Sequence, residues 1–324
     1  MKRTFSARLA AAAFGLALAG AAAAQGWPER PVHVVVPAPA GSSLDVVVRT
    51  LGEKLKERWK QPIVVDNKPG AGGLLGMDAV AKAPPDGLTL GIGFNGPIAF
   101  APFMYKKLPY DPARDLAPVV LTTSQPNVLA VPAANPAKTL PQFIAWAKGQ
   151  GDKVSYASVG NGSSSHLTAE LFDRETGIHA VHVPYNGSPP AATSVAAGET
   201  QMLFAVAPAL LPMVQAGKLR LLAVTSLERV PTMKDLPTLA EQGLPGFEAL
   251  AWNGLFAPAA TPAALIERIN ADVNAALREA DVREAFARQG LIVGGGSAAE
   301  FKALIERDAK KWGAIITLAG IRLE

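Results

Sequence analysis

The chain has 324 residues, of which 49% are hydrophobic, a formal net charge of +4 and no cysteine. The absence of cysteine excludes disulfides, thiol catalysis and thiolate metal sites. A chain of roughly three hundred residues usually folds as two lobes rather than around one core. Its lysines and arginines form no stripe interleaved with aromatic residues, so we expect no nucleic-acid partner.

Residues 1–24 have the pattern of a signal peptide. Lys2, Arg3 and Arg8 form a basic region, an Ala/Leu-rich run follows, and the three alanines at 22–24 fit the small-residue cleavage rule. The apolar run is too short and too rich in alanine to span a membrane permanently. Removal of these three cations would lower the net charge from +4 to +1. We therefore expect a soluble, exported protein.

Strand-like and helix-like runs alternate along the chain, which predicts an α/β fold. The β-branched run at 32–36 predicts the first strand, and apolar residues at helical spacing between Leu44 and Trp59 predict the helix that follows. Ser42 and Asp45 have the spacing of a capping box at its start. The next predicted elements are a strand at 63–65, a helix that begins at 70–73 and ends at the 84–87 turn, and a strand at 88–92.

Two changes of composition, near 122–127 and 246–253, predict that the chain crosses twice between lobes. We predict that lobe 1 consists of residues 25–125 plus 250–324, and lobe 2 of residues 126–249. The ligand cleft of such a fold lies between the lobes, near the carboxyl ends of strands. The middle block has strand-like runs of its own, at 154–157, 180–183, 202–206 and 219–224.

Two loops rich in Gly and Ser each follow a strand-like run and open a helix; they cover residues 37–45 and 158–166. Each presents unpaired backbone N–H groups and hydroxyls at a helix N-terminus, where the dipole equals roughly half a positive charge. Such helix ends bind anions without Lys or Arg. The pair of loops therefore predicts a two-lobed anion-binding protein.

Residues 91–96 match the glycine pattern of dinucleotide-binding folds, but their context differs. A functional motif needs a helix directly after it and an acidic residue at the end of the next strand. Here Pro97 follows, and Asp115 lies in a polar turn region. We therefore expect no nicotinamide cofactor, although Asn95 is a candidate for the wall of the cleft.

The serines at 163–165 with His166 suggest an alternative function, a secreted serine hydrolase. No Gly-x-Ser-x-Gly elbow precedes them, and residues three apart on a helix merely share a face. Helix capping is therefore the preferred interpretation. His179 and His182 would point to opposite faces of a strand, with no acidic cluster beside them, so we expect no metal site.

A series of short motifs runs through almost the whole mature chain, at 27–31, 37–45, 65–73, 80–90, 108–112, 165–167, 182–187, 237–243 and 254–262. They include Val-Asp-Asn-Lys-Pro-Gly-Ala-Gly-Gly in the third and His-Val-Pro-Tyr-Asn-Gly in the seventh. Each motif alone is weak, but their order is specific. In this order the chain resembles the Bug family, the extracytoplasmic binding proteins of tripartite tricarboxylate transporters.

The resemblance implies a type II-like periplasmic binding protein whose two lobes close on a small carboxylate held by backbone and hydroxyl groups. It also implies binding without catalysis, a periplasmic location and membrane transporter subunits as partners, and we expect a monomer. A sensor that presents its ligand to a signalling receptor is an alternative with the same fold. The binding residues carried over by position are Ala40, Gly41, Ser42, Ser43, Asp45, Asn95, Gly160, Asn161, Gly162, Ser163, Ser164, His166, Tyr185 and Ala207.

The first loop departs from the family pattern, which commonly has Phe where this chain has Ala38 and Gly where it has Ser42. An aromatic side chain accounts for roughly 150–250 Å² of buried surface. Its replacement by Ala38 predicts a roomier cleft and a preference for a bulky or aromatic carboxylate. The alternative is that position 38 lies behind the loop and affects only packing.

Overall fold

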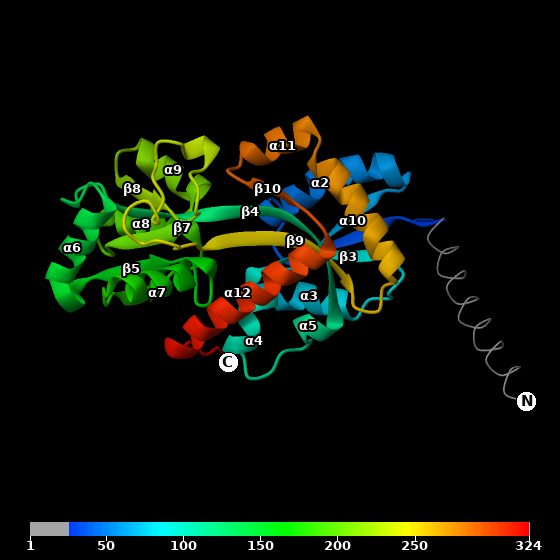
Figure 1. Ribbon diagram of the computed structural model, residues 1–324, viewed down its shortest axis with the longest axis horizontal. Coiled ribbons are helices and arrows are strands. Elements are labelled where there is room, and N and C mark those ends of the chain that lie inside the picture. Colours follow the sequence, from blue (N-terminus) through cyan, green and yellow to red (C-terminus); the bar gives the residue numbers. More distant parts are fainter. Residues whose placement is uncertain (1–25, 324) are drawn as a thin grey trace, which may run out of the picture.

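The computed structural model describes residues 26–323, so the predicted signal peptide lies outside the described residues. Two lobes lie side by side along the longest axis of the molecule (Figure 1). Two long strands, β4 (Leu116–Pro132) and β9 (Leu250–Pro258), run along this axis where the lobes meet. Strands and helices alternate throughout, so the predicted α/β fold is confirmed.

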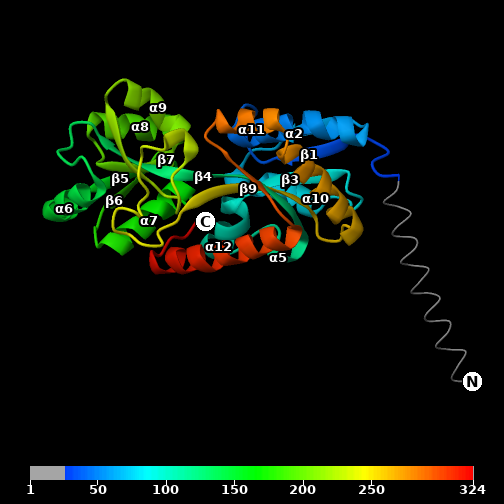
Figure 2. The same cartoon turned by 45° about the horizontal axis from the view of Figure 1, so that its top comes forward.

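The sheet of the first lobe has the strand order β2-β1-β3-β9-β4, and β10 pairs with β4. Its first three strands are mutually parallel, whereas β9 and β10 run antiparallel to their neighbours. Helices cover both faces, as Figure 2 shows for α2, α10 and α11 above the sheet and α12 below it. The elements of this lobe besides β4 and β9 are β1 (Val32–Val36), α2 (Ser43–Trp59), β2 (Ile63–Asn67), α3 (Leu74–Ala81), β3 (Thr89–Phe94), α4 (Ala101–Met104), α5 (Pro112–Asp115), α10 (Ala263–Leu277), α11 (Ala280–Ala287), β10 (Ile292–Gly295) and α12 (Ala298–Leu318).

The second lobe is built around the end of β4, which lies between β7 and β8 and runs antiparallel to both. β5 continues this sheet, parallel to β7 on one side and to β6 on the other. The elements are α6 (Leu140–Gln150), β5 (Ser155–Ser158), α7 (Ser164–Thr176), β6 (Val181–Pro184), α8 (Ser188–Ala197), β7 (Met202–Val206), α9 (Ala207–Gln215) and β8 (Leu219–Val224).

The partners of β4 change partway along the strand. Residues 116–126 pair with β9, whereas Asn127 and the residues after it pair with β7 and β8. The chain returns at Ala249, whose N–H donates to the carbonyl of Thr225 at 2.9 Å before Leu250 pairs with Pro126. The lobe limits given above stay a prediction, and this change of partners is consistent with them.

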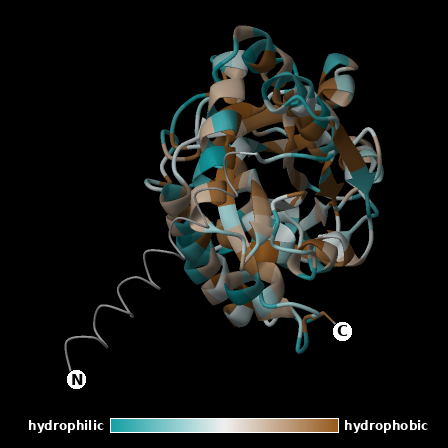
Figure 3. Ribbon diagram, turned by 90° about the vertical axis from the view of Figure 1, so that its right-hand side faces the viewer, coloured by the Kyte–Doolittle hydropathy of each residue, from teal (hydrophilic) through white to brown (hydrophobic). Residues whose placement is uncertain are grey.

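Burial on both faces explains why β1 forms a central strand. Val32, Val34 and Val36 pack with α2 and α10 on one face, and Val35 packs on the other face with Met77 of α3. Burying such a side chain stabilises the fold by about 1.5–3 kcal/mol. Hydrophobic residues accordingly concentrate on the inner strands in Figure 3.

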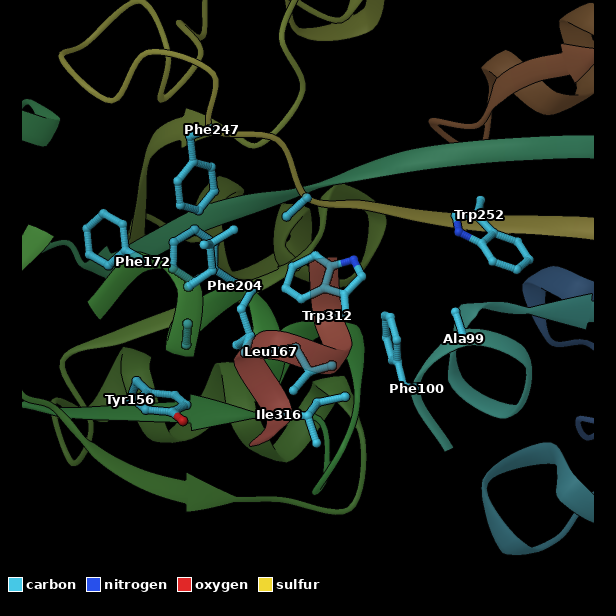
Figure 4. Close-up of a cluster of buried hydrophobic side chains, with 14 of the residues drawn as sticks. Ala99, Phe100, Tyr156, Leu167, Phe172, Phe204, Phe247, Trp252, Trp312 and Ile316 are labelled. Carbon is cyan, nitrogen blue, oxygen red and sulfur yellow. The ribbon is translucent and has the colours of Figure 1, made fainter. Parts of the chain in front are cut away.

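One apolar cluster extends across both lobes beneath α12. Trp312 of this helix packs edge-on against Phe100, with ring centroids 5.6 Å apart. Ile316, one turn further along, belongs to the same buried cluster as Leu167 and Phe172 of α7 (Figure 4). The C-terminal helix therefore packs against the second lobe as well as the first. Among residues 26–323, no helix is both long and apolar enough to cross a membrane.

Candidate functional site

A cavity of about 410 Å³ lies between the lobes and includes residues of both Gly/Ser loops. None of its lining residues carries a charged side chain. Two larger cavities, of about 530 and 710 Å³, lie along α12 and contain no residue of either loop. The smaller cavity is lined by Ser43, Leu44, Ala71, Gly72, Leu74, 94–97, Ala101, Met104, Tyr105, Gln125, 159–164, Ala251, Asn253 and Leu323.

The first loop is fixed by a cap and a buried carboxylate. Ser42 caps α2, its Oγ accepting from the N–H of Asp45 at 3.3 Å. The carboxylate of Asp45 accepts from the N–H of Gly41, from Asn67 and from two nitrogens of Arg49 at 2.9 and 3.1 Å. The Arg49 hydrogen bonds lower the pKa of Asp45 to about 2. Asp45 therefore holds the loop and does not line the cavity.

The second loop repeats this arrangement with a histidine in place of the aspartate. Ser163 caps α7, its Oγ accepting from the N–H of His166 at 3.2 Å and donating to the carbonyl of Gly160 at 2.7 Å. The N–H of Gly162 donates to Nδ1 of His166 at 3.0 Å. Because Nδ1 accepts this bond, Nε2 is the ring nitrogen that can donate, and it lies 3.6 Å from Glu170.

The rings of His166, His182 and Tyr156 stack behind the second loop. The imidazoles of His166 and His182 lie 3.8 Å apart, and Tyr156 stacks on His182 at 4.8 Å. Burial lowers the pKa of His182 to about 4, so this ring is neutral and shares a hydrogen bond with Oγ of Ser158 at 2.7 Å. The Tyr156 hydroxyl donates to Glu170, whose pKa is lowered mainly by its hydrogen bond with His166.

The residue after each cap, Ser43 in α2 and Ser164 in α7, lines the cavity. The N–H groups in the first turn of a helix have no partner within the helix, and the dipole makes this end attractive to anions. Oγ of Ser164 accepts from Nδ2 of Asn127 at 2.9 Å, which leaves its own O–H able to donate. The cavity thus offers hydrogen-bond donors from both lobes.

Buried amides form the part of the wall nearest the crossing strands. Asn95 donates to the carbonyl of Leu250 at 3.2 Å, and Asn253 donates to Oγ1 of Thr123 at 3.0 Å. Gln125 of β4 also lines the cavity. These amides hold the cavity to the two strands that join the lobes.

The structure brings seven of the sequence-predicted residues into the cavity wall: Ser43, Asn95, Gly160, Asn161, Gly162, Ser163 and Ser164. The other seven lie outside the cavity wall. Tyr185 donates to Ser194 at 2.6 Å, and Ala207 is buried at the start of α9. The others outside the wall are Ala40, Gly41, Ser42, Asp45 and His166.

Position 38 contributes no space to this cavity. Ala38 packs against the apolar cluster of the first lobe, its carbonyl accepts from Asn67 at 3.1 Å, and it is absent from the cavity wall. The presence of alanine at position 38, where the family commonly has an aromatic residue, therefore does not enlarge this cavity. Fifteen lining residues are not among the predicted binding residues. Of these, Gln125, Ala251 and Asn253 lie within the predicted crossing segments, whereas Met104, Tyr105 and Leu323 carry no signal in the sequence.

The serines near His166 do not contact its ring. Ser163 binds the carbonyl of Gly160, and Ser165 donates to the carbonyl of Phe204 at 2.5 Å. Nδ1 of His166 is occupied by the Gly162 N–H, and Nε2 faces Glu170. These contacts support the loop and give no nucleophile–base pair at these residues. Among residues 26–323, no three His, Asp or Glu side chains cluster as metal ligands would.

Several known proteins are similar to this chain in sequence and in fold. BugT of Bordetella pertussis is 34% identical over 313 residues, which cover 95% of this chain and 96% of BugT. The protein Rpa4515 of R. palustris, solved with adipate, is 34% identical, with a TM-score of 0.80 over 91% of this chain and 99% of that one. MatC of Rhodopseudomonas palustris, solved with bound malate, is 33% identical, with a TM-score of 0.75 over 90% of this chain and 100% of that one.

The predicted fold and family resemblance are confirmed by these likenesses together with a match of residues 47–321 to the family model described as tripartite tricarboxylate transporter family receptor, TctC. The match includes all of the predicted second lobe and most of the first, and it ends at residue 321, two residues before the last described one. The chain belongs to the TctC family of tripartite tricarboxylate transporter receptors.

Proposed function

We propose that this chain captures a small carboxylate in the cavity between its lobes and delivers it to a membrane transporter of the tripartite tricarboxylate type. The observation that carries the proposal is the pair of serine-capped helix N-termini, α2 and α7, which enter one cavity from opposite lobes. The ligand-contacting groups are the hydroxyls of Ser43 and Ser164 and the N–H groups beside them. Asn95 and residues 160–163 complete the polar wall.

A carboxylate suits this cavity better than a cation or a neutral sugar. The helix N-termini provide N–H donors and a positive end of the dipole, and no acidic side chain lines the cavity to attract a cation. A hydrogen bond to a charged group contributes about 1.5–3 kcal/mol. A few such bonds hold a carboxylate in place without Lys or Arg.

The relatives support this choice of ligand. Rpa4515 was solved with adipate and MatC with malate, and both are carboxylates. Each covers at least 90% of this chain at 33–34% identity. We therefore use adipate and malate as the first probes.

A thermal-shift screen tests the ligand class. A ligand at a hundred times its dissociation constant stabilises a protein by about 2.7 kcal/mol, which raises the melting temperature of a chain of this size by a few degrees. We expect carboxylates to produce this shift, and amines or neutral sugars of similar size to leave the melting temperature unchanged. Stabilisation by amines or sugars alone would refute the proposal.

The two lobes are proposed to close around the ligand. They are joined by the crossings near Asn127 and Ala249, and hinge closure is a common response of such folds to a ligand. Small-angle scattering should give a smaller radius of gyration with saturating ligand. Identical curves with and without ligand would contradict closure.

Location and transport need separate tests. We propose that residues 1–24 are removed on export to the periplasm and that the mature protein acts as a monomer. Mass spectrometry of the periplasmic fraction should find a chain that begins near Gln25. Deletion of the protein should abolish uptake of its labelled ligand by cells, whereas intact uptake with a lost transcriptional response would favour the sensor alternative.

A further inference from the structure

The segment 321–323 lies beyond the end of α12 and brings Leu323 into the cavity wall. The N–H of Leu323 donates to the carbonyl of Met104 at 2.9 Å, and Leu323 forms a parallel bridge with Tyr105. The guanidinium of Arg322 donates to the carbonyl of Phe103. The segment is thus fastened to the first lobe at the cavity.

This segment also touches the second loop. A Cβ atom on Gly162 would lie 2.6 Å from Sδ of Met104 and 3.3 Å from Cδ1 of Leu323. Gly162 has φ +69°, a left-handed conformation that suits glycine. The side chains of Met104 and Leu323 therefore lie directly against the loop that presents Ser163 and Ser164. Donors for a carboxylate and an apolar surface are neighbours in this cavity.

We propose that Met104, Tyr105 and Leu323 form a selecting wall, and that the ligand is a carboxylate whose remaining body is uncharged. This inference rests on the proposed function, because it takes the α2 and α7 N-termini as the carboxylate site. The selecting wall offers one neutral hydroxyl, on Tyr105, and two side chains without a hydrogen-bond donor. A second carboxylate placed against it would lose its hydration without gaining a cation, which is unfavourable.

A matched pair of ligands tests the selecting wall. Hexanoate and adipate have the same six-carbon chain and differ in the second carboxylate. We expect calorimetry to find that the parent binds hexanoate about tenfold more tightly than adipate. The variant Leu323→Lys supplies a cation at the wall, so its affinity for adipate should rise about tenfold relative to hexanoate.

Leu318 provides the control for this substitution. It is the last residue of α12, five positions before Leu323, is 70% exposed and does not line the 410 Å³ cavity. Leu318→Lys adds the same charge and should leave the ratio of the two affinities unchanged. Leu323→Ala serves as a second variant, since it keeps the backbone bond to Met104; it should weaken hexanoate at least fivefold and adipate by less. Circular dichroism of each variant checks that it is folded.

The outcomes separate the two proposals. The selecting wall is overturned if the parent binds the two ligands within threefold of each other, prefers adipate, or binds malate but not hexanoate. It is also overturned if Leu323→Lys and Leu318→Lys change the ratio equally, or if Leu323→Ala leaves both affinities unchanged. By contrast, a parent that binds no carboxylate would remove the proposed function, and the selecting wall with it.

Discussion

The N–H of Gly162 donates to Nδ1 of His166 at 3.0 Å, across four residues at the start of α7. This bond fixes the loop that precedes Ser163 and Ser164, while the ring itself is buried behind the cavity wall. We therefore expect His166 to influence ligand binding through the loop and not by contact.

Replacement of His166 by Phe should loosen this loop. The ring volume and stacking on His182 are largely kept, but the Gly162 N–H loses its acceptor. We expect the free energy of unfolding to fall by about 1–3 kcal/mol, the effect of an unpaired buried donor, and ligand affinity to fall severalfold. Calorimetry and thermal unfolding measure both effects. His179→Phe, at an exposed position, is the control and should bind like the parent.

The serines of the two helix starts should separate into two classes. Ser43→Ala and Ser164→Ala remove hydroxyls that line the cavity, so each should weaken carboxylate binding about tenfold or more. Ser42→Ala removes the α2 cap and should lower the free energy of unfolding by about 1 kcal/mol, with a smaller effect on affinity. Calorimetry on the three variants checks this order. Equal losses of affinity in all three would contradict the assignment of Ser43 over Ser42.

Asp45→Asn should weaken the first loop at neutral pH. The carboxylate accepts from Gly41 and Arg49, and these bonds favour its charged form. Because the pKa of Asp45 is lowered to about 2 from 3.8, its stabilising effect is present above about pH 4 and is lost as the pH falls toward 2. We expect the variant to lose about 1–3 kcal/mol at pH 7.

Denaturant unfolding at pH 7 and pH 3 measures this difference. The gap in stability between the parent and Asp45→Asn should narrow at pH 3, because the unfolded parent, with the ordinary Asp pKa of 3.8, binds a proton there while the folded parent stays mostly charged. Asp111→Asn changes another helix-capping carboxylate, one that does not line the cavity, and should leave ligand affinity unchanged. A constant gap between pH 7 and pH 3 would refute the role of the Asp45 charge.

Local chemistry explains which parts of the site are predictable from sequence. Ser42 with Asp45, and Ser163 with His166, have the spacing of a capping interaction, and both pairs form it. Capping involves residues within one turn, so the sequence contains the whole interaction. The face of the helix that meets the cavity depends instead on packing. In the first loop the cap Ser42 lies outside the wall and Ser43 lines it, whereas in the second loop both the cap Ser163 and the next residue Ser164 line it.

The rest of the cavity depends on contacts that are distant in sequence. Leu323 reaches the cavity by pairing with Tyr105, and the neighbouring bond from Arg322 to Phe103 joins residues 219 positions apart. No periodicity or motif marks such a contact in the sequence. Ala38 shows the converse case, since a departure from the family pattern at a loop lies behind the wall and not in it. The α/β fold itself is predictable because alternating strands and helices recur along the whole chain.

Asp173 should make stability depend on pH in the opposite sense to Asp45. Burial raises its pKa to about 7, and its Oδ1 is buried without a hydrogen-bond partner. The folded state therefore keeps a proton that the unfolded chain releases near pH 4, so stability falls as the pH rises from about 4 to about 7. Asp173→Asn, which is always neutral, should be more stable than the parent by up to about 4 kcal/mol at pH 8, since a pKa difference of one corresponds to about 1.4 kcal/mol, and equal to it at pH 4.

Thermal unfolding from pH 4 to pH 8 measures this difference. His182 also titrates in the window, with its pKa lowered to about 4, but it is present in both proteins and cancels in the comparison. The control is Asp152→Asn, an exposed carboxylate on the rim of the same 710 Å³ cavity, whose effect should be small at every pH. An Asp173→Asn variant less stable than the parent at pH 8 would contradict the burial argument.

Asn127 of β4 links the start of α7, which follows the second loop, to the strands that cross between the lobes. Its Nδ2 donates to Oγ of Ser164 at 2.9 Å and to Oγ1 of Thr168 at 3.0 Å, and its own N–H donates to Thr225. Since Ser164 accepts from Asn127, the Ser164 proton is available to the ligand. Asn127→Asp replaces this donor by an acceptor and, when ionised, places a negative charge behind the carboxylate site.

Ligand affinity in Asn127→Asp should therefore depend on pH. Burial raises the pKa of a carboxyl group at a position that is 2% exposed, so at pH 5 the new side chain is neutral. Its single O–H then replaces the donor to Ser164, while the bond to Thr168 is lost at both pH values. At pH 8 the side chain is charged, the Ser164 hydroxyl turns toward it, and affinity should fall about tenfold or more.

Asn135→Asp is the matched control, because Asn135 is also buried, its Oδ1 accepts from Ala137, and it lies outside the cavity wall. Calorimetry at the two pH values should find a pH-dependent loss in Asn127→Asp alone; a loss of the same size at pH 5 and pH 8 would show that the variant acts by disturbing the fold and not through the Ser164 proton.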